Sequence, residues 1–320
     1  MISESKMIAF GPVPSRRLGH SLGINNIPPK ICTYSCIYCQ LGRSLRMQVD
    51  RGEFYNPEEI FKEVENKVSK AVKRGEPIDY LTFVPDGEPT LDINLGKEIA
   101  LLKPLGIKIA VITNASIIWK ADVREDLSKA DWVSLKIDAP SQDVWRRIDR
   151  AYRSLKLDNI LQGMVEFSRI FSGKLTTETM LIQDINDSTE EIEKTANFIV
   201  GLKPEKSYIS IPTRPPAEKW VNPATEHAIN KAYQLFSERS INVEYLIGYE
   251  GNAFAFTGNV EDDLLSITSV HPMRKDGVEE FLVKAHANWV VVERLIDENK
   301  LVEVTFKGNK FYVRRLSSVA

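Results

Sequence analysis

The chain has 320 residues, of which 43 % are apolar and 27 % charged, and its formal net charge at pH 7 is −2. This composition is normal for a globular protein with a buried core, and the balanced charge gives no overall basic field of the kind that binds nucleic acid. No stretch approaches the roughly 18 apolar residues of a membrane span, and residues 1–19 lack an apolar signal core. We therefore expect a cytoplasmic protein without a membrane segment.

Short apolar runs alternate with helical patterns from about Ser21 to Gly251. Strands are expected at 21–25, 79–84, 107–113, 131–137, 175–182 and 207–212, with a seventh candidate at 241–248, and helices at 56–75, 94–103, 122–129, 157–171, 188–202 and 223–238. Repeated strand–helix units with short loops predict right-handed crossovers and a parallel sheet. Six units are too few for a closed barrel, so we expect an α/β fold, either a partial (β/α)6 TIM-like barrel or a doubly wound sheet. In both, functional loops lie at the carboxyl ends of the strands.

The pattern changes near residue 256. Three short helical patterns and a hairpin around Gly308-Asn309 follow, which is the order of a winged helix. We therefore expect two domains, 1–255 and 256–320. The third helical pattern is acidic and the hairpin is basic, so the tail fits a nucleic-acid contact, a protein-docking module or a lid.

All three cysteines of the chain, Cys32, Cys36 and Cys39, fall in one short segment at C-x3-C-x2-C spacing. Clustered thiols in a chain without a secretion signal favour a metal site in a reducing compartment over disulfides. A structural zinc site normally needs four protein ligands, and His20 is the only nearby fourth candidate. Three thiolates instead suit a four-iron cluster with one iron left open for chemistry, while a coincidental group of structural cysteines is the plain alternative.

With Tyr38 directly before the third cysteine and a predicted strand before the first, the motif resembles that of the radical S-adenosylmethionine (radical SAM) superfamily. The resemblance implies a [4Fe-4S] cluster whose open iron binds S-adenosylmethionine (SAM). It further implies that an electron from a partner such as ferredoxin or flavodoxin cleaves SAM to a 5′-deoxyadenosyl radical, which abstracts hydrogen from a substrate. The alternative is a non-enzymatic iron–sulfur regulator with a winged helix.

Two segments after predicted strands resemble further superfamily motifs. In "DGEPTL", the resemblance makes Gly87 a point of close backbone approach and Glu88 an acceptor for the methionine ammonium of SAM. In "ITNAS", it makes Asn114 a cofactor-pocket amide. The plain alternative for the first segment is a turn before a helix.

The strand "SLKIDAP" places Ser134, Lys136 and Asp138 on one face, because side chains in a strand alternate. An inward lysine in an apolar strand is costly unless it is paired. The resemblance gives Lys136 to the methionine carboxylate and Asp138 to the ribose of SAM, and Ser134 to the same pocket. An ordinary Lys–Asp pair is the alternative.

Four residues are candidates for contact with the substrate: Arg16, Arg17, His20 and Arg214. They lie in segments that resemble the UPF0026 group of the superfamily, which is grouped broadly with the wyosine tRNA synthases. Arginines at the mouth of a site suit phosphate or carboxylate groups, although they equally well bridge carboxylates on neighbouring loops. His227, His271 and His286 are expected to be structural.

The absence of further cysteines excludes an auxiliary cluster held by this chain's own cysteines. The expected reaction is therefore hydrogen abstraction from an RNA base, as in tRNA modification, or from a small metabolite or a protein residue with the tail as docking module. The sequence identifies no catalytic residue beyond the cofactor ligands.

Overall fold

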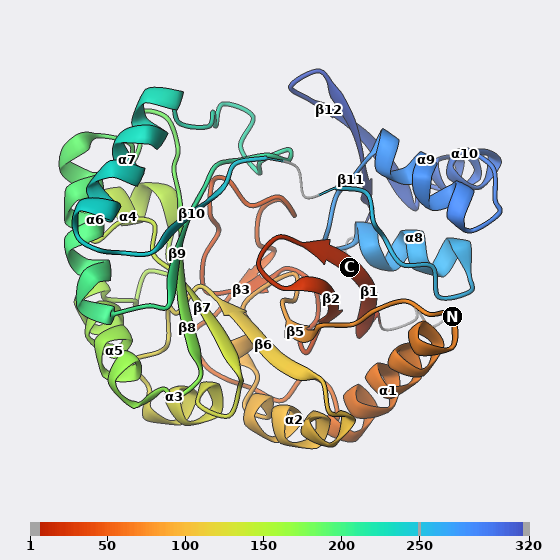
Figure 1. Ribbon diagram of the computed structural model, residues 1–320, viewed down its shortest axis with the longest axis horizontal. Helices are drawn as coiled ribbons and strands as arrows, with labels where there is room; N and C mark the ends of the chain where they lie inside the picture. The colour runs from red at the N-terminus through yellow and green to blue at the C-terminus, as the bar shows by residue number, and fades with distance from the viewer. Residues whose placement is uncertain (1–6, 249–250, 316–320) are drawn as a thin grey trace.

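The computed structural model describes residues 7–248 and 251–315 and centres on an eight-stranded sheet. The sheet curls into a half-barrel with helices along its outer side (Figure 1). In spatial order its strands are β1 (Ala9–Ser15), β2 (Gly19–Ile24), β5 (Tyr80–Phe83), β6 (Lys108–Thr113), β7 (Trp132–Lys136), β8 (Lys174–Met180), β9 (Lys206–Ser210) and β10 (Val243–Leu246). Neighbours from β2 to β10 are parallel, and only β1 is antiparallel to its partner.

Helices follow most of the parallel strands. They are α1 (Pro57–Lys73), α2 (Leu95–Leu102), α3 (Ala121–Leu127), α4 (Gln142–Asp149), α5 (Leu157–Ile170), α6 (Thr189–Leu202) and α7 (Glu226–Glu238). Short pieces complete this part of the chain: β3 (Ile31–Cys32), β4 (Arg46–Met47) and two 3-10 turns at Pro89–Leu91 and Lys103–Leu105. The strand–helix alternation expected from the sequence is confirmed.

Local sequence explains where α1 begins and which face it buries. The Asn56 side chain accepts a hydrogen bond from the Glu58 backbone nitrogen at 2.9 Å, and Pro57 occupies the first turn. An asparagine cap followed by proline and acidic residues satisfies the free N–H groups and suits the helix dipole. Ile60 and Val64, one turn apart, are buried against the sheet.

Besides the two-residue strands, β1 and α4 differ from the sequence expectation. The six expected strands and the seventh candidate are all present, but β1 was not expected, so the half-barrel has eight strands rather than six. Pro12 and Pro14 argue against a strand at β1 in the sequence, because proline lacks the N–H group that a central strand needs. An edge strand tolerates proline, and β1 pairs only with β2. Helix α4 was also missed.

The turn between β1 and β2 enters the half-barrel from the amino ends of the parallel strands (Figure 1). Leu18 in this turn is buried in a cluster with Ala110, Trp132, Tyr208 and Leu246, which come from β6, β7, β9 and β10. The turn therefore fills the amino end of the interior, and the space at the carboxyl ends is left to the cysteine loop.

The C-terminal elements form a second layer beside β1 (Figure 1). They are α8 (Val260–Thr268), β11 (Met273–Arg274), α9 (Lys275–Lys284), α10 (Val290–Asp297), β12 (Leu301–Phe306) and β13 (Asn309–Arg314), with the strands in the order β11-β13-β12. The three expected helices and the hairpin are present. Phe10 and Val13 of β1 are buried in one cluster with Leu264 and Ile267 of α8, so this layer shares its core with the half-barrel.

Within residues 7–248 and 251–315, no helix is long and apolar enough to cross a bilayer. Residues 1–6, part of the segment considered for a signal sequence, lie outside the described residues.

Candidate active site at the cysteine loop

The cysteine loop follows β2 and lies at the carboxyl ends of the parallel strands. Backbone hydrogen bonds fix it on two sides: the Ile37 nitrogen donates to the Ile148 carbonyl at 3.0 Å, and the Glu218 nitrogen donates to the Ile37 carbonyl at 3.0 Å. The loop is therefore held between the end of α4 and the segment after β9. Neither contact is local in sequence.

The three thiols lie near one another and near carboxylates. The Cys32 sulfur accepts from the Asn114 side-chain amide at 3.5 Å, and the Cys36 thiol donates to Asp149 at 3.3 Å. Burial, then the charge of Glu88, raises the pKa of Cys32 to about 12. Burial and Asp149 also raise the pKa of Cys36, and the charges of Cys32 and Cys39 add to that rise.

This donor set fits a cluster with three protein ligands. Three soft sulfur atoms come from one loop, and they are close enough for the charge of one to shift the pKa of another. In the described residues no three His, Cys, Asp or Glu side chains, the three cysteines included, are arranged to hold a single metal ion; in a four-iron cluster each thiolate would instead bind a different iron.

Gly87 brings the loop after β5 against the cysteine loop. It forms an isolated parallel bridge with Ile31, the residue before the first cysteine, and a Cβ atom at Gly87 would collide with the Ile31 carbonyl oxygen. The Glu88 nitrogen donates to that same carbonyl at 3.2 Å. Only glycine permits this close approach of two backbones.

Glu88 is buried and joins the ends of β5 and β6. Its Oε1 accepts from the hydroxyl groups of Thr90 and Thr113, each at 2.6 Å, and its Oε2 accepts from the Asn114 nitrogen at 2.8 Å. The Asn114 amide in turn donates to Thr33, next to Cys32, at 2.8 Å. Glu88 thus fixes Asn114, and Asn114 reaches the cysteine loop.

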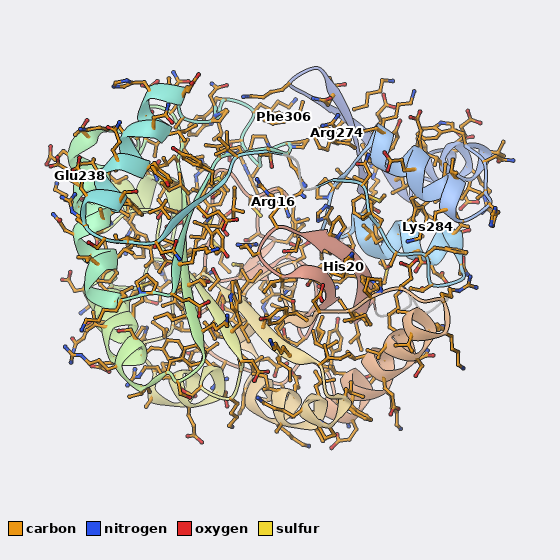
Figure 2. All side chains as sticks on the ribbon, in the orientation of Figure 1. Arg16, His20, Glu238, Arg274, Lys284 and Phe306 are labelled. Carbon is orange, nitrogen blue, oxygen red and sulfur yellow. The ribbon has the colours of Figure 1, made fainter. Side chains whose placement is uncertain are left out.

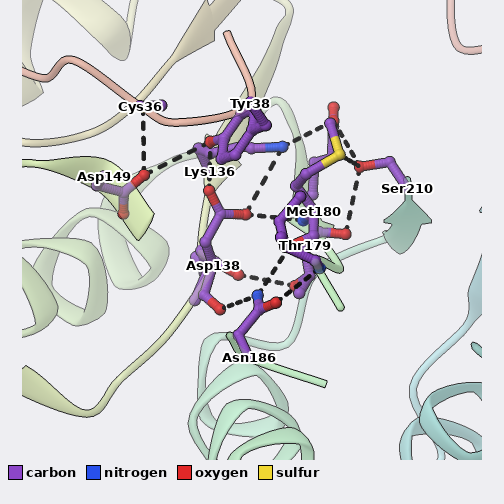
Figure 3. A network of polar contacts seen from close by, with 12 residues as sticks. Cys36, Tyr38, Lys136, Asp138, Asp149, Thr179, Met180, Asn186 and Ser210 are labelled. Carbon is purple, nitrogen blue, oxygen red and sulfur yellow. Dashed lines mark hydrogen bonds and ion pairs between the residues drawn. The ribbon is translucent and has the colours of Figure 1, made fainter. Parts of the chain in front are cut away.

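A buried polar network connects the cysteine loop to the end of β7 (Figure 3). The Tyr38 hydroxyl donates to Asp138, and the Met180 nitrogen donates to Asp138 Oδ1 at 2.7 Å. The Asn186 amide donates to the backbone carbonyl of Asp138 at 2.8 Å. The Lys136 ammonium lies 5.1 Å from the centre of the Tyr38 ring, a cation–π distance.

Lys136 is paired, as an inward lysine requires. Its ammonium lies 2.9 Å from Glu178 Oε1 and 3.7 Å from Asp138 Oδ1, and Arg17 contacts the other oxygen of Glu178. Burial alone would favour the neutral acid, but the cations of Lys136 and Arg17 hold the pKa of Glu178 below its ordinary value. An ion-paired chain therefore runs from the β1–β2 turn to the cysteine loop.

Sequence reasoning missed two acids at this site, Asp149 and Glu178. Asp149 ends the unexpected helix α4 and accepts from Cys36, and burial together with the Asp138 charge raises its pKa well above the ordinary value. Glu178 lies on the inward face of β8. The same argument that singled out Lys136, a charged residue on an inward strand face, could have found Glu178.

Arg214 lies beside the cysteine loop and the C-terminal layer. Its guanidinium donates to the Gln40 side chain at 2.7 Å and lies 2.9 Å from Nε2 of His271. Gln40, directly after Cys39, also donates to the Val270 carbonyl at 3.1 Å. Residues around position 270 are therefore attached to the cysteine loop.

Three candidates remain: His20, Arg16 and Ser134. His20 is at the start of β2, the amino end of the barrel, where its ring lies 3.0 Å from Asp79. Arg16 is exposed in the β1–β2 turn, and Figure 2 labels both residues near that turn. Ser134 is buried and lies two residues before Lys136 on the same face of β7. The structure thus brings Arg17 and Arg214 toward the site and places His20 at the amino end of the barrel.

Comparisons with known proteins agree with this architecture. The family model described as "Radical SAM superfamily" matches residues 26–199. A UPF0026 protein of Methanocaldococcus jannaschii is 47 % identical over 97 % of both chains, and one of Helicobacter pylori is 34 % identical over 68 % of this chain and 70 % of its own. A radical SAM methyltransferase structure from Sphaerobacter thermophilus shares the fold at a TM-score of 0.53 and 15 % identity, over 71 % of this chain and 66 % of that one. The chain therefore belongs to the radical SAM superfamily of enzymes and, within it, to the UPF0026 family.

Proposed function

We propose that Cys32, Cys36 and Cys39 hold a [4Fe-4S] cluster and that SAM binds beside it at the carboxyl ends of the strands. The observation that carries this proposal is the position of the chain's three thiols, on one loop held against the Asp138–Lys136 network. When bound, the cluster supplies the electron that cleaves SAM and so generates the radical that abstracts hydrogen from a substrate. Membership of the superfamily implies that chemistry.

The chain's own residues bind and orient the cofactor in this proposal. Gly87 lets the backbone after β5 pack directly against the cysteine loop, and Glu88 holds Asn114 in place. Asp138, fixed by Tyr38 and the Met180 nitrogen, offers carboxylate oxygens to hydroxyl groups of the ribose, and Lys136 offers a cation to the methionine carboxylate. We assign the buried Ser134, two residues before Lys136 on the same face of β7, to the same pocket.

We further propose that residues 256–320 form a winged-helix-like domain. The order helix, short strand, two helices and hairpin supports it. Several of its cations are paired with its own acids, among them Lys300 with Glu261 and Lys310 with Glu303. Lys307 at the tip of the hairpin is exposed and forms no ion pair within the described residues.

The substrate we propose is an RNA base, with the hairpin touching the backbone of the RNA. The tip of the hairpin supports this choice: the half-buried Phe306, labelled in Figure 2, directly precedes the exposed Lys307, and an aromatic ring and a cation suit a base and a phosphate. Binding of tRNA should then weaken steeply with salt, and Lys307→Glu should reduce it. Salt-independent or absent tRNA binding would favour the alternative, a small metabolite or protein residue.

The cluster assignment has a direct test. Anaerobic reconstitution should give about four irons and four sulfides for each chain. Cys32→Ala, Cys36→Ala and Cys39→Ala should each lose most of the iron and the associated visible absorption. Retention of a full iron content by any of the three variants would exclude that cysteine as a ligand.

A further inference from the structure

The outer side of the cysteine loop carries a basic surface. Three segments meet there, 35–46, 147–153 and 217–221, through the backbone bonds of Ile37 to Ile148 and Glu218. Together they contain six cations, Arg43, Arg46, Arg147, Arg150, Arg153 and Lys219. Their two acids, Asp149 and Glu218, are both buried. We call these three segments the basic patch.

The exposed groups of the basic patch are suited to contact another protein. The side chain of Arg43 is 67 % exposed although it pairs with Glu218 at 2.8 Å, and Arg150 pairs with the same carboxylate. Leu45, two residues after Arg43, is 70 % exposed, and Trp220, two residues after Glu218, is 53 % exposed. Cations around an exposed tryptophan and leucine are typical of contact surfaces.

The basic patch is close to the thiols but separated from the interior of the half-barrel. Arg43 follows Cys39 by four residues, so their Cα atoms are at most about 14 Å apart. Beneath the patch, Ile37, Ile148, Ile182 and Val221 form a buried apolar cluster, against which Tyr38 packs. An electron can cross packed side chains, whereas a substrate base on this surface could not reach the Lys136 network.

We propose that the basic patch is the docking site for the acidic electron-transfer protein that reduces the cluster. This inference rests on the proposed function, because radical SAM enzymes need a reductant. One electron passes from the reduced partner, which is oxidised, to the cluster, which is reduced; no bond is formed or broken and no proton moves. Acidic partners match the sign of the patch, and electron-transfer encounters use small interfaces that depend on charge steering.

The test compares two reductants on one enzyme. In the double variant Arg43→Gln/Lys219→Glu, Glu218 keeps Arg150 as partner, so the loop retains its ion pair. At low salt, formation of 5′-deoxyadenosine driven by a reduced acidic ferredoxin should fall about 10-fold or more, while formation driven by dithionite stays unchanged. Trp220→Ala, tested in the same way, should also slow only the ferredoxin-driven reaction.

The matched control is Lys97→Gln/Arg169→Glu. It likewise neutralises one paired cation and reverses one exposed cation, on α2 and α5. Equal ferredoxin-driven rates in the patch variant and the control variant would refute the proposal that the basic patch is the docking site. A patch variant that loses tRNA binding but keeps its ferredoxin-driven rate would refute it as well. If dithionite yields no product even with the unmodified chain, the proposed function fails instead. The docking site is then judged by whether ferredoxin binding weakens in the patch variant and not in the control.

Discussion

The ion pairs of Glu178 inside the half-barrel predict how strongly the Glu178→Gln substitution lowers the free energy of unfolding. Its two oxygens face two different cations, Lys136 and Arg17, and all three side chains are largely buried. Glu178→Gln keeps the shape of the side chain and removes its charge. Among the described residues, Lys136 then retains Asp138, at 3.7 Å, as its only carboxylate partner, and Arg17 loses the carboxylate it contacts.

Leaving a buried charge without its partner typically costs about 3–5 kcal/mol, so Glu178→Gln should lower the free energy of unfolding by that amount. Arg17→Met should cost less, roughly 1.5–3 kcal/mol, because Glu178 keeps Lys136 and the Ser210 hydroxyl at 3.0 Å. The pKa of Glu178 is lowered in the folded chain. Its stabilising effect is therefore present above the ordinary value of 4.5 and is lost as pH falls below it.

Urea unfolding followed by circular dichroism at pH 7 and at about pH 3.5 measures both effects. The unmodified chain should lose stability between these pH values more steeply than Glu178→Gln does. A loss below about 1 kcal/mol in Glu178→Gln at pH 7, or a larger loss in Arg17→Met, would refute the reasoning that Glu178 balances two buried cations.

Two further stability predictions concern regions outside the cysteine loop. Burial and the neighbouring Asp92 charge raise the pKa of Glu98, so the free energy of unfolding should fall as pH rises above the ordinary pKa of 4.5. Glu98→Gln should flatten this dependence between pH 5 and 8, as measured by urea unfolding at each pH. Equal slopes for the variant and the unmodified chain would contradict the prediction. In a chain that ends at residue 255, Phe10 and Val13 lose the C-terminal side chains that bury them. Burial of each such side chain stabilises the fold by roughly 1.5–3 kcal/mol, so the shortened chain should melt at a lower temperature or aggregate. A truncated chain that melts like the full one would show that the C-terminal layer does not stabilise β1.

The parallel strands were predictable from the sequence because each is a short apolar run between helical patterns. Strand β1 was not, since its two prolines argue against a strand unless its position at the sheet edge is already known. Helix α4 is only eight residues long and buries only Trp145, Ile148 and Asp149, so it holds too few apolar side chains to mark a helix in the sequence.

The candidate site was predictable where residues share a motif or a strand face. The alternation of side chains along β7 correctly placed Lys136 and Asp138 together on the inner face. Contacts set by tertiary structure were not predictable: Asp149 reaches Cys36 across more than a hundred residues, and Gln40 reaches Val270 across more than two hundred. His20 was a candidate for substrate contact, but it lies at the start of β2, at the opposite end of the barrel from the cysteine loop.

The most direct test of the account is cleavage of SAM by the reconstituted chain. Under anaerobic conditions with dithionite, the unmodified chain should convert SAM to 5′-deoxyadenosine and methionine, detected by liquid chromatography with mass spectrometry, and Cys36→Ala should form neither above the level of a protein-free control. No 5′-deoxyadenosine from a chain that carries its full complement of iron, or equal amounts from Cys36→Ala, would contradict the assignment of this loop as the site of radical chemistry.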